Sequence, residues 1–172
     1  MLILIDGYNL IRQSDTLRSY ERKSLEAGRK ALIAKLVEYG KKRAHQITVV
    51  FDGVKNGWAE EGRDREGKIN IIYSRHGERA DDVIKRTAER TMEEVIVVSS
   101  DREISSYVSK LGKTPLSSPE FEIIMNKIIS SSPEQITPAQ KDDVHEHQSK
   151  KKGPSKRLPR VKRQTQTKIK KL

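Results

Sequence analysis

The chain has 172 residues and a formal net charge of +11, with 35 Lys and Arg against 24 Asp and Glu. Eleven of the basic residues lie in the last 25 positions, which hold no acid, so the rest of the chain is balanced and is not a uniformly basic surface for nucleic acid. The chain has no Cys, which excludes a disulfide scaffold, thiolate zinc sites and cysteine nucleophiles.

Short apolar segments rich in β-branched residues alternate with segments of helical period. The predicted elements, in chain order, are strand 2–5, helix 25–37, strand 47–51, strand 69–73, helix 83–92, strand 95–98, helix 104–111 and a last helix from Ser118. Most of the strands are apolar at nearly every position, which is typical of strands covered on both faces. We therefore predict a three-layer α/β/α, Rossmann-like domain with a mostly parallel central sheet.

The composition changes near residue 130. All eight aromatic residues lie at or before Phe121, and the sequence beyond Ser130 is polar with few large apolar side chains. Such a segment buries too little apolar surface to offset its chain entropy. We expect a domain over residues 1–130 and a disordered linker and basic tail over 131–172.

The N-terminal apolar run ends at Asp6, too early for a signal peptide or a spanning helix, so we expect a cytoplasmic protein without membrane contact.

Acidic residues follow the predicted strands. Asp6, Asp52 and Asp101 come just after three of them, and a short loop leads from the other to Asp81 and Asp82 at a helix start. The carboxyl ends of parallel strands meet at one edge of a sheet, where ligands bind. Each Asp alone is most simply a helix cap or a turn residue. Together they would repel one another unless a cation compensates, and oxygen ligands without His or Cys indicate Mg²⁺ or Mn²⁺ and phosphodiester chemistry.

Residues 4–11, Leu-Ile-Asp-Gly-Tyr-Asn-Leu-Ile, resemble the signature strand and loop of the NYN domain, in its YacP-like bacterial branch within the PIN-like nuclease superfamily. Residues 49–53, 78–84 and 97–101 are similar to the later motifs of that family and occur in the same order. The resemblance covers residues 1 to about 129. Two departures are Arg79, where a Thr is expected, and the basic tail in place of a long helical C-terminal region.

The resemblance implies a metal-dependent endoribonuclease that binds one or two Mg²⁺ or Mn²⁺ ions and leaves a 5′-phosphate and a 3′-hydroxyl. Asp6, Asp81 and Asp101 are its implied metal ligands, and Asp82 is a further candidate. Asp52 is an implied auxiliary group at the same edge. Asn9 is expected to orient a water, Asp6 or the substrate phosphate.

Basic and aromatic residues near this edge are candidate RNA contacts. Arg12, Arg75 and Arg79 lie in the loops that frame it, and Trp58 lies in a loop with two glycines, where it either stacks on a base or anchors the loop. The tail is expected to bind RNA backbones without sequence preference, through residues that include Lys150, Lys151, Lys152, Lys156 and Arg157. The expected partner is messenger or ribosomal RNA, with the ribosome as a candidate.

Other functions stay open at this point. One is a catalytically inactive RNA- or ribosome-binding adaptor with the same fold, and the tail alone could serve solubility. A phosphohydrolase with an aspartyl nucleophile is disfavoured, because Tyr8 stands two residues after Asp6, where such enzymes carry a second acid.

Overall fold

The computed structural model describes residues 1–53, 61–131, 166–169 and 171–172. Trp58 and the tail residues Lys150, Lys151, Lys152, Lys156 and Arg157 lie outside the described residues, so their predicted contacts with RNA stay predictions.

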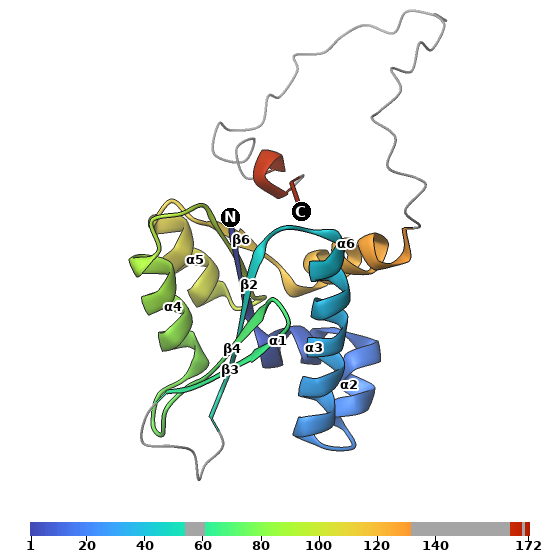
Figure 1. Ribbon diagram of the computed structural model, residues 1–172. Helices are drawn as coiled ribbons and strands as arrows, with labels where there is room; N and C mark the ends of the chain where they lie inside the picture. The colour runs from blue at the N-terminus through green and yellow to red at the C-terminus, as the bar shows by residue number, and fades with distance from the viewer. Residues whose placement is uncertain (54–60, 132–165, 170) are drawn as a thin grey trace, which may run out of the picture.

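The described residues form a six-stranded sheet in the order β3-β4-β2-β1-β5-β6 (Figure 1). Every neighbouring pair is parallel except β3 and β4, which are antiparallel. The mostly parallel α/β sheet predicted from the sequence is thus confirmed. Its strands are β1 Leu2–Asp6, β2 Gln46–Phe51, β3 Gly62–Glu66, β4 Ile69–Tyr73, β5 Val95–Val98 and β6 Thr114–Leu116.

The sequence analysis did not predict the two outermost strands, β3 and β6. β3 is mostly charged and exposed, and it pairs with β4 across a turn in which Gly67 has a φ of 60°. β6 has three residues, one of which is Pro115. Edge strands of this kind lack the continuous apolar run that identifies a central strand, because one side or face of each meets solvent.

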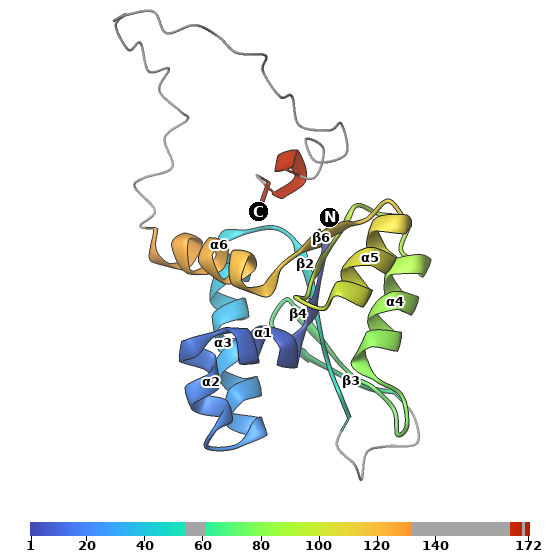
Figure 2. The ribbon, with the colours of Figure 1, turned by 180° about the vertical axis from the view of Figure 1, so that it is seen from behind.

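Helices pack on both faces of the sheet (Figures 1 and 2). One face carries α1, α2, α3 and α6, and the other carries α4 and α5. The predicted three layers are therefore present, although α1 and α2 were not expected. The helices are α1 Gly7–Gln13, α2 Asp15–Glu21, α3 Leu25–Lys42, α4 Ala80–Arg90, α5 Arg102–Lys110 and α6 Ser118–Ser130.

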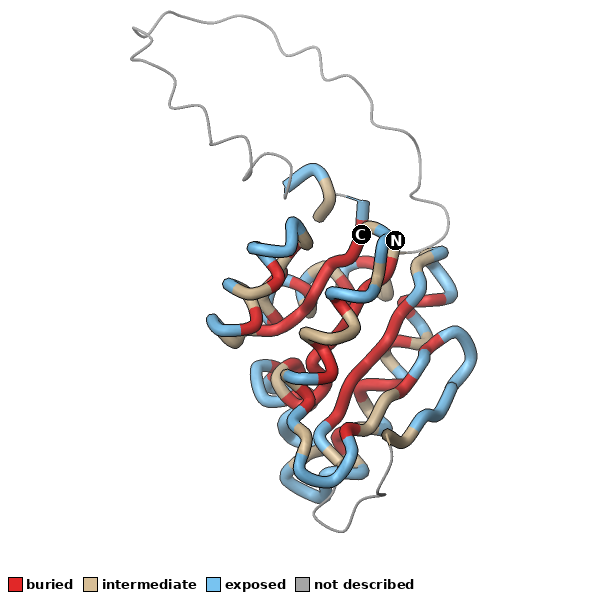
Figure 3. Tube along the Cα trace, turned by 90° about the vertical axis from the view of Figure 1, so that its left-hand side faces the viewer, coloured by how far each residue is buried: buried red, intermediate tan, exposed pale blue. Residues whose placement is uncertain are grey.

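The alternation of side chains along β1 divides the core into two parts. Ile3 and Ile5 pack with α1, α3 and α6, while Leu2 and Leu4 pack with α4 and α5. Every residue of β1 is buried, and Figure 3 shows the central strands as the most deeply buried part of the chain. Met92, which we expected on the apolar face of a helix, lies beyond the end of α4 and is 95% exposed.

The last residues of the chain lie against the amino-terminal edge of the sheet. Residues 166–169 form a helical turn, and Leu172 is buried in the core beside Tyr39. Arg43 Nε donates a hydrogen bond to the Leu172 carbonyl over 2.6 Å. We expected this end of the tail to be disordered, like the rest of 131–172, and its contacts with the core differ from that expectation. Ile169 and Leu172, three positions apart, supply the apolar surface for these contacts. The polar composition of the tail, rich in Lys, gave no sign of them.

None of the helices in the described ranges has both the length and the apolar character that crossing a membrane requires.

Candidate active site

Asp6 ends β1 and caps the amino terminus of α1. Its Oδ1 accepts a hydrogen bond from the Asn9 amide over 3.2 Å, and its Oδ2 accepts one from the Ser99 hydroxyl over 3.0 Å. The residue is only 8% exposed. Burial raises the pKa of Asp6 to about 6, against the lowering effect of the two hydrogen bonds, and the negative charges of Asp81 and Asp52 raise it further. Asp6 is thus a carboxylate whose charge is costly near neutral pH.

Asp52 connects the end of β2 to the start of α4. Its Oδ1 accepts a hydrogen bond from the Ala80 amide over 2.7 Å, across 28 residues of sequence. This bond fixes the first turn of α4, and with it Asp81, beside the edge of the sheet. Burial raises the pKa of Asp81, the neighbouring Arg79 guanidinium lowers it, and the charges of Asp101 and Asp52 raise it. Four of the five acids predicted to meet at this edge therefore interact electrostatically, namely Asp6, Asp52, Asp81 and Asp101.

Asp101 caps the amino terminus of α5. Its Oδ1 accepts hydrogen bonds from the amides of Glu103 and Ile104, over 2.6 and 3.3 Å. Its own amide donates to the Ser99 hydroxyl over 3.1 Å, and that hydroxyl donates to Asp6. Helix capping, one of the two interpretations left open by the sequence, is thus true of both Asp6 and Asp101, and Ser99 links the two residues. Ser99 is a site residue that the sequence analysis missed, although it stands in the motif that contains Asp101.

A glycine follows Asp6 and another follows Asp52, and in both places the chain leaves no room for a side chain. A Cβ on Gly7 would overlap the Phe51 ring, and one on Gly53 would overlap the Ser74 carbonyl oxygen. The Gly53 amide donates to the Ser74 hydroxyl over 2.9 Å. The Asp-Gly pairs therefore serve close packing between neighbouring strand ends.

Asn9 holds together three elements beside the site. Its side-chain oxygen accepts hydrogen bonds from the Ser100 amide over 2.9 Å and from the Ser118 hydroxyl over 2.8 Å. The loop after β5 and the start of α6 are thus tied to α1. The expected role of Asn9 in orienting a water or the substrate stays a prediction.

Asp82 is engaged in capping α4. Its Oδ2 accepts a hydrogen bond from the Arg79 amide over 3.3 Å. The residue is exposed and lines an open hollow of about 570 Å³ with Arg75, His76, Gly77 and Glu78. Its predicted part in metal binding stays a prediction.

The three predicted RNA-binding arginines of the described residues are each paired with an acid and remain largely exposed. Arg12 pairs with Glu21 over 3.2 Å, with 61% of its side chain exposed. Arg75 pairs with Glu78 over 3.3 Å, and Arg79 pairs with Asp81 over 2.9 Å. They are thus available at the surface with part of their charge already balanced.

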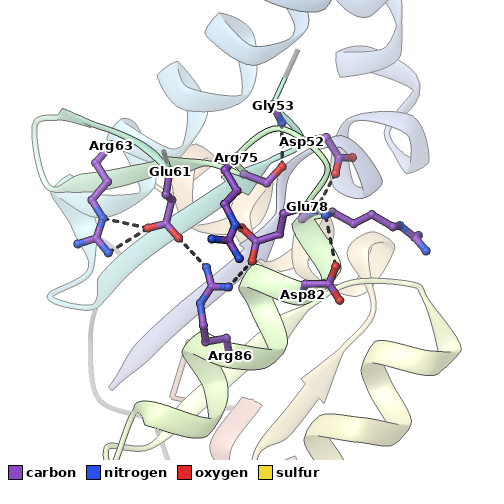
Figure 4. Close-up of polar contacts among 11 residues, drawn as sticks. Asp52, Gly53, Glu61, Arg63, Arg75, Glu78, Asp82 and Arg86 are labelled. Atoms are coloured by element: carbon purple, nitrogen blue, oxygen red, sulfur yellow. Dashed lines mark hydrogen bonds and ion pairs between the residues drawn. The ribbon is translucent and has the colours of Figure 1, made fainter. Parts of the chain in front are cut away.

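A network of ion pairs that the sequence analysis did not find lies beside these acids (Figure 4). Arg86 on α4 donates to Glu78 in the loop before it and, over 2.7 Å, to Glu61 before β3. Arg63 pairs with Glu61 over 2.9 Å. The Glu78 side chain is only 8% exposed. The network joins β3, the loop after β4 and α4, and so supports the segment that carries Asp81.

The residue types of the site suit a cation with oxygen ligands, although its acids do not form a complete set of ligands around one point. In the part of the chain that the structure describes, no group of three or more His, Cys, Asp or Glu lies close enough to hold a metal ion. Mg²⁺ is ordinarily held by one or two carboxylates together with waters and substrate phosphates. Mutually repelling carboxylates, one of them buried, fit that manner of binding.

A mostly parallel α/β sheet with interacting carboxylates at its strand ends agrees with the PIN-like class that the sequence resembles. The family model of the YacP-like NYN domain matches residues 3–171, and the chain belongs to this family. The match extends well beyond residue 129, where we expected the resemblance to end, and so includes the tail.

Known proteins similar to this chain include YacP of Bacillus subtilis. The uncharacterized protein YacP of strain 168 is 31% identical over 90 residues, which are 51% of this chain and 51% of that protein, so the chain spans about half the length of the curated relative it matches. The crystal structure of Rae1 (YacP) from the same organism is similar with a TM-score of 0.62 and 25% identity over 74% of this chain and 75% of the other. The crystal structure of a mutant of Rae1 has the same TM-score at 24% identity, over 74% and 76% of the two chains.

Proposed function

We propose that this chain is a metal-dependent endoribonuclease that hydrolyses messenger or ribosome-associated RNA. The observation that carries the proposal is the state of Asp6, a nearly buried carboxylate with a pKa of about 6 that also faces the charges of Asp81 and Asp52. A divalent cation offsets such repulsion, and RNA phosphates supply the remaining oxygen ligands. Membership of the YacP-like NYN family supports nuclease chemistry.

Asp6, Asp81 and Asp101 are the residues that would hold Mg²⁺ or Mn²⁺, directly or through water, with Asp52 beside them. The bound ion, or pair of ions, would polarise the phosphodiester, lower the pKa of the attacking water and neutralise the leaving oxygen.

The protein's own contribution is to keep these acids in place and ionised. The hydrogen bonds that Asp6 accepts from the Asn9 amide and the Ser99 hydroxyl favour its charged form. The Asp52 bond to the Ala80 amide positions Asp81. Attack by water leaves a 5′-phosphate and a 3′-hydroxyl, without use of the RNA 2′-hydroxyl as a nucleophile.

Single-turnover cleavage of an RNA with Mn²⁺ tests the proposal. We expect Asp6→Asn and Asp81→Asn each to lower the rate about a hundredfold or more. Asp64→Asn, which changes an exposed acid of β3, is the matched control and leaves the rate unchanged. Equal rates in wild type and the Asp6→Asn, Asp81→Asn double variant would refute the nuclease, and products ending in a 2′,3′-cyclic phosphate would refute the mechanism.

The alternative function is a catalytically inactive RNA- or ribosome-binding adaptor. The observation in its favour is that the acids of the described residues are not drawn together into a three-ligand group. An adaptor binds RNA equally well with or without Mn²⁺ and cleaves none of it, which the same cleavage experiment distinguishes.

A further inference from the structure

Two arginines flank the Tyr8 ring at the carboxyl edge of the sheet. Arg29 Nη1 donates a hydrogen bond to the Tyr8 hydroxyl over 3.5 Å, and the Arg29 guanidinium lies 5.5 Å from the centre of the Tyr73 ring. The Arg12 guanidinium lies 5.4 Å from the centre of the Tyr8 ring. Phe51 contacts both tyrosines, with ring centres 5.2 Å from Tyr8 and 5.9 Å from Tyr73. The aromatic rings thus hold Arg29 over the ends of three neighbouring strands.

These rings stand beside the acids of the candidate active site. Tyr8 follows Asp6 by two residues, and Phe51 immediately precedes Asp52. Burial raises the pKa of Tyr8, and the charge of Asp52 contributes to that rise. Arg29 is therefore on α3 but next to the acidic edge, on the face of the sheet opposite α4.

The charge of Arg29 is held in place and only partly balanced, because it acts on the exposed Glu26 carboxylate, whose pKa it helps to lower, without forming an ion pair with it. Arg12 has Glu21 as its partner at 3.2 Å, whereas no ion pair within the described ranges joins Arg29 to a carboxylate. Contacts with aromatic rings orient a guanidinium and leave N–H donors free for an anion. A guanidinium binds phosphate through two parallel hydrogen bonds, which a flexible Lys does not reproduce.

We propose that Arg29, with Arg12 beside it, forms a phosphate-binding subsite that holds an RNA phosphodiester next to the acidic edge. The inference rests on the proposed function, since RNA is the substrate it assigns. An edge lined by carboxylates repels RNA, and a fixed cation beside it is needed to bring a phosphate close. Arg29 supplies that cation from the face of the sheet opposite α4, whose N-cap is Arg79.

Binding of a short fluorescein-labelled single-stranded RNA, followed by anisotropy, tests the subsite. The parent is the full chain with Asp81→Asn, measured without added divalent cation, so that RNA cleavage is too slow to disturb the binding measurement. Arg29→Gln is expected to weaken binding about tenfold. It is also expected to reduce the slope of the logarithm of the association constant against the logarithm of salt concentration by about 0.7, which is the contribution of one phosphate contact to single-stranded RNA. Arg29→Lys is expected to keep the slope and to lose part of the affinity. Lys41→Gln, at the exposed far end of the same helix, is the charge-matched control and binds like the parent.

Three outcomes overturn the subsite: unchanged affinity and slope in Arg29→Gln, equal losses in Arg29→Gln and Lys41→Gln, or weaker binding in proportion to a lowered melting temperature. Should Arg29→Gln fail to fold, Arg29→Lys decides, because reduced affinity at an unchanged melting temperature supports the subsite and unchanged affinity overturns it. The two proposals fail separately. Loss of binding in Arg29→Gln with no cleavage by wild type refutes the nuclease alone, and cleavage with unchanged binding refutes the subsite alone.

Discussion

The Ser99 hydroxyl donates a hydrogen bond to Asp6 Oδ2 over 3.0 Å, joining two residues that are 93 positions apart in the sequence. The same hydroxyl accepts a hydrogen bond from the Asp101 amide over 3.1 Å. Ser99 therefore links two of the acids of the candidate site, and it stabilises the charged form of the more deeply buried one.

Replacing Ser99 with Ala is expected to raise the pKa of Asp6 above its value of about 6. The substitution removes a hydrogen bond that lowers this pKa, and burial then acts with less opposition. A cation competes with protons for Asp6, so the pH at which Mn²⁺ binding falls to half should move up by about one unit. Titration calorimetry across pH measures this. Ser109→Ala on the exposed side of α5 is the control, and an unmoved midpoint in Ser99→Ala contradicts the assigned role.

Replacing Asp6 with Asn is expected to stabilise the fold at neutral pH while lowering the cleavage rate. The pKa of Asp6 is raised from 3.8 to about 6, so between these values the folded state binds more protons than the unfolded chain, and the stability of the wild type falls as pH rises through that window. Asn has no charge to bury and avoids this loss. The gain at pH 7.5 should be about 1–3 kcal/mol and should shrink toward zero below pH 4.

Urea denaturation at about pH 7.5 and below about pH 4 measures this gain. EDTA is present because bound metal would otherwise stabilise the wild type. Asp64→Asn is again the control, since an exposed acid changes the free energy of unfolding little at either pH. The idea fails if Asp6→Asn is no more stable than wild type at pH 7.5.

The central strands and the acidic edge could be predicted because both follow from short-range pattern. Strands covered on both faces are apolar along their length, as residues 2–5 of β1 and all of β5 are, and their burial is confirmed. Parallel pairing then brings strand ends together whatever the sequence between them, as the pairing of Asp6 with Val50 in β1 and β2 illustrates.

The supporting contacts could not be predicted because they depend on pairings across the chain. Glu61 and Arg86 are 25 residues apart, and nothing in their local sequence distinguishes them from solvated surface charges. Arg29 lies within a helical segment, and only the packing of α3 against α1 brings it to Tyr8. Ile169 and Leu172 stand among basic residues, and their place in the core depends on contacts with residues far away in the sequence.

Replacing Gly53 with Ala is expected to displace Asp52 and to destabilise the protein by about 1–3 kcal/mol. The new Cβ would overlap a backbone oxygen of Ser74, so the chain after β2 has to move. That movement should break the bond between Asp52 and the Ala80 amide, and hydrogen exchange at Ala80 should become faster. Gly62→Ala is the control, because its Cβ would meet Tyr73 at an ordinary 3.4 Å. Unchanged exchange at Ala80 in Gly53→Ala would show that the close approach does not position Asp52.

Replacing Arg86 with Met is expected to destabilise the protein by about 2 kcal/mol, because it leaves the buried Glu78 carboxylate without its strongest partner. The cost is below that of a fully buried pair, since 31% of the Arg86 side chain is exposed. Adding Glu78→Gln should recover part of the loss, because the remaining group no longer carries a charge. Arg90→Met, an exposed change on the same helix, is the control. Urea denaturation of wild type, Arg86→Met, Glu78→Gln and the double variant gives the coupling free energy. Additive losses in the double variant would mean that the Arg86 contact to Glu78 does not support α4.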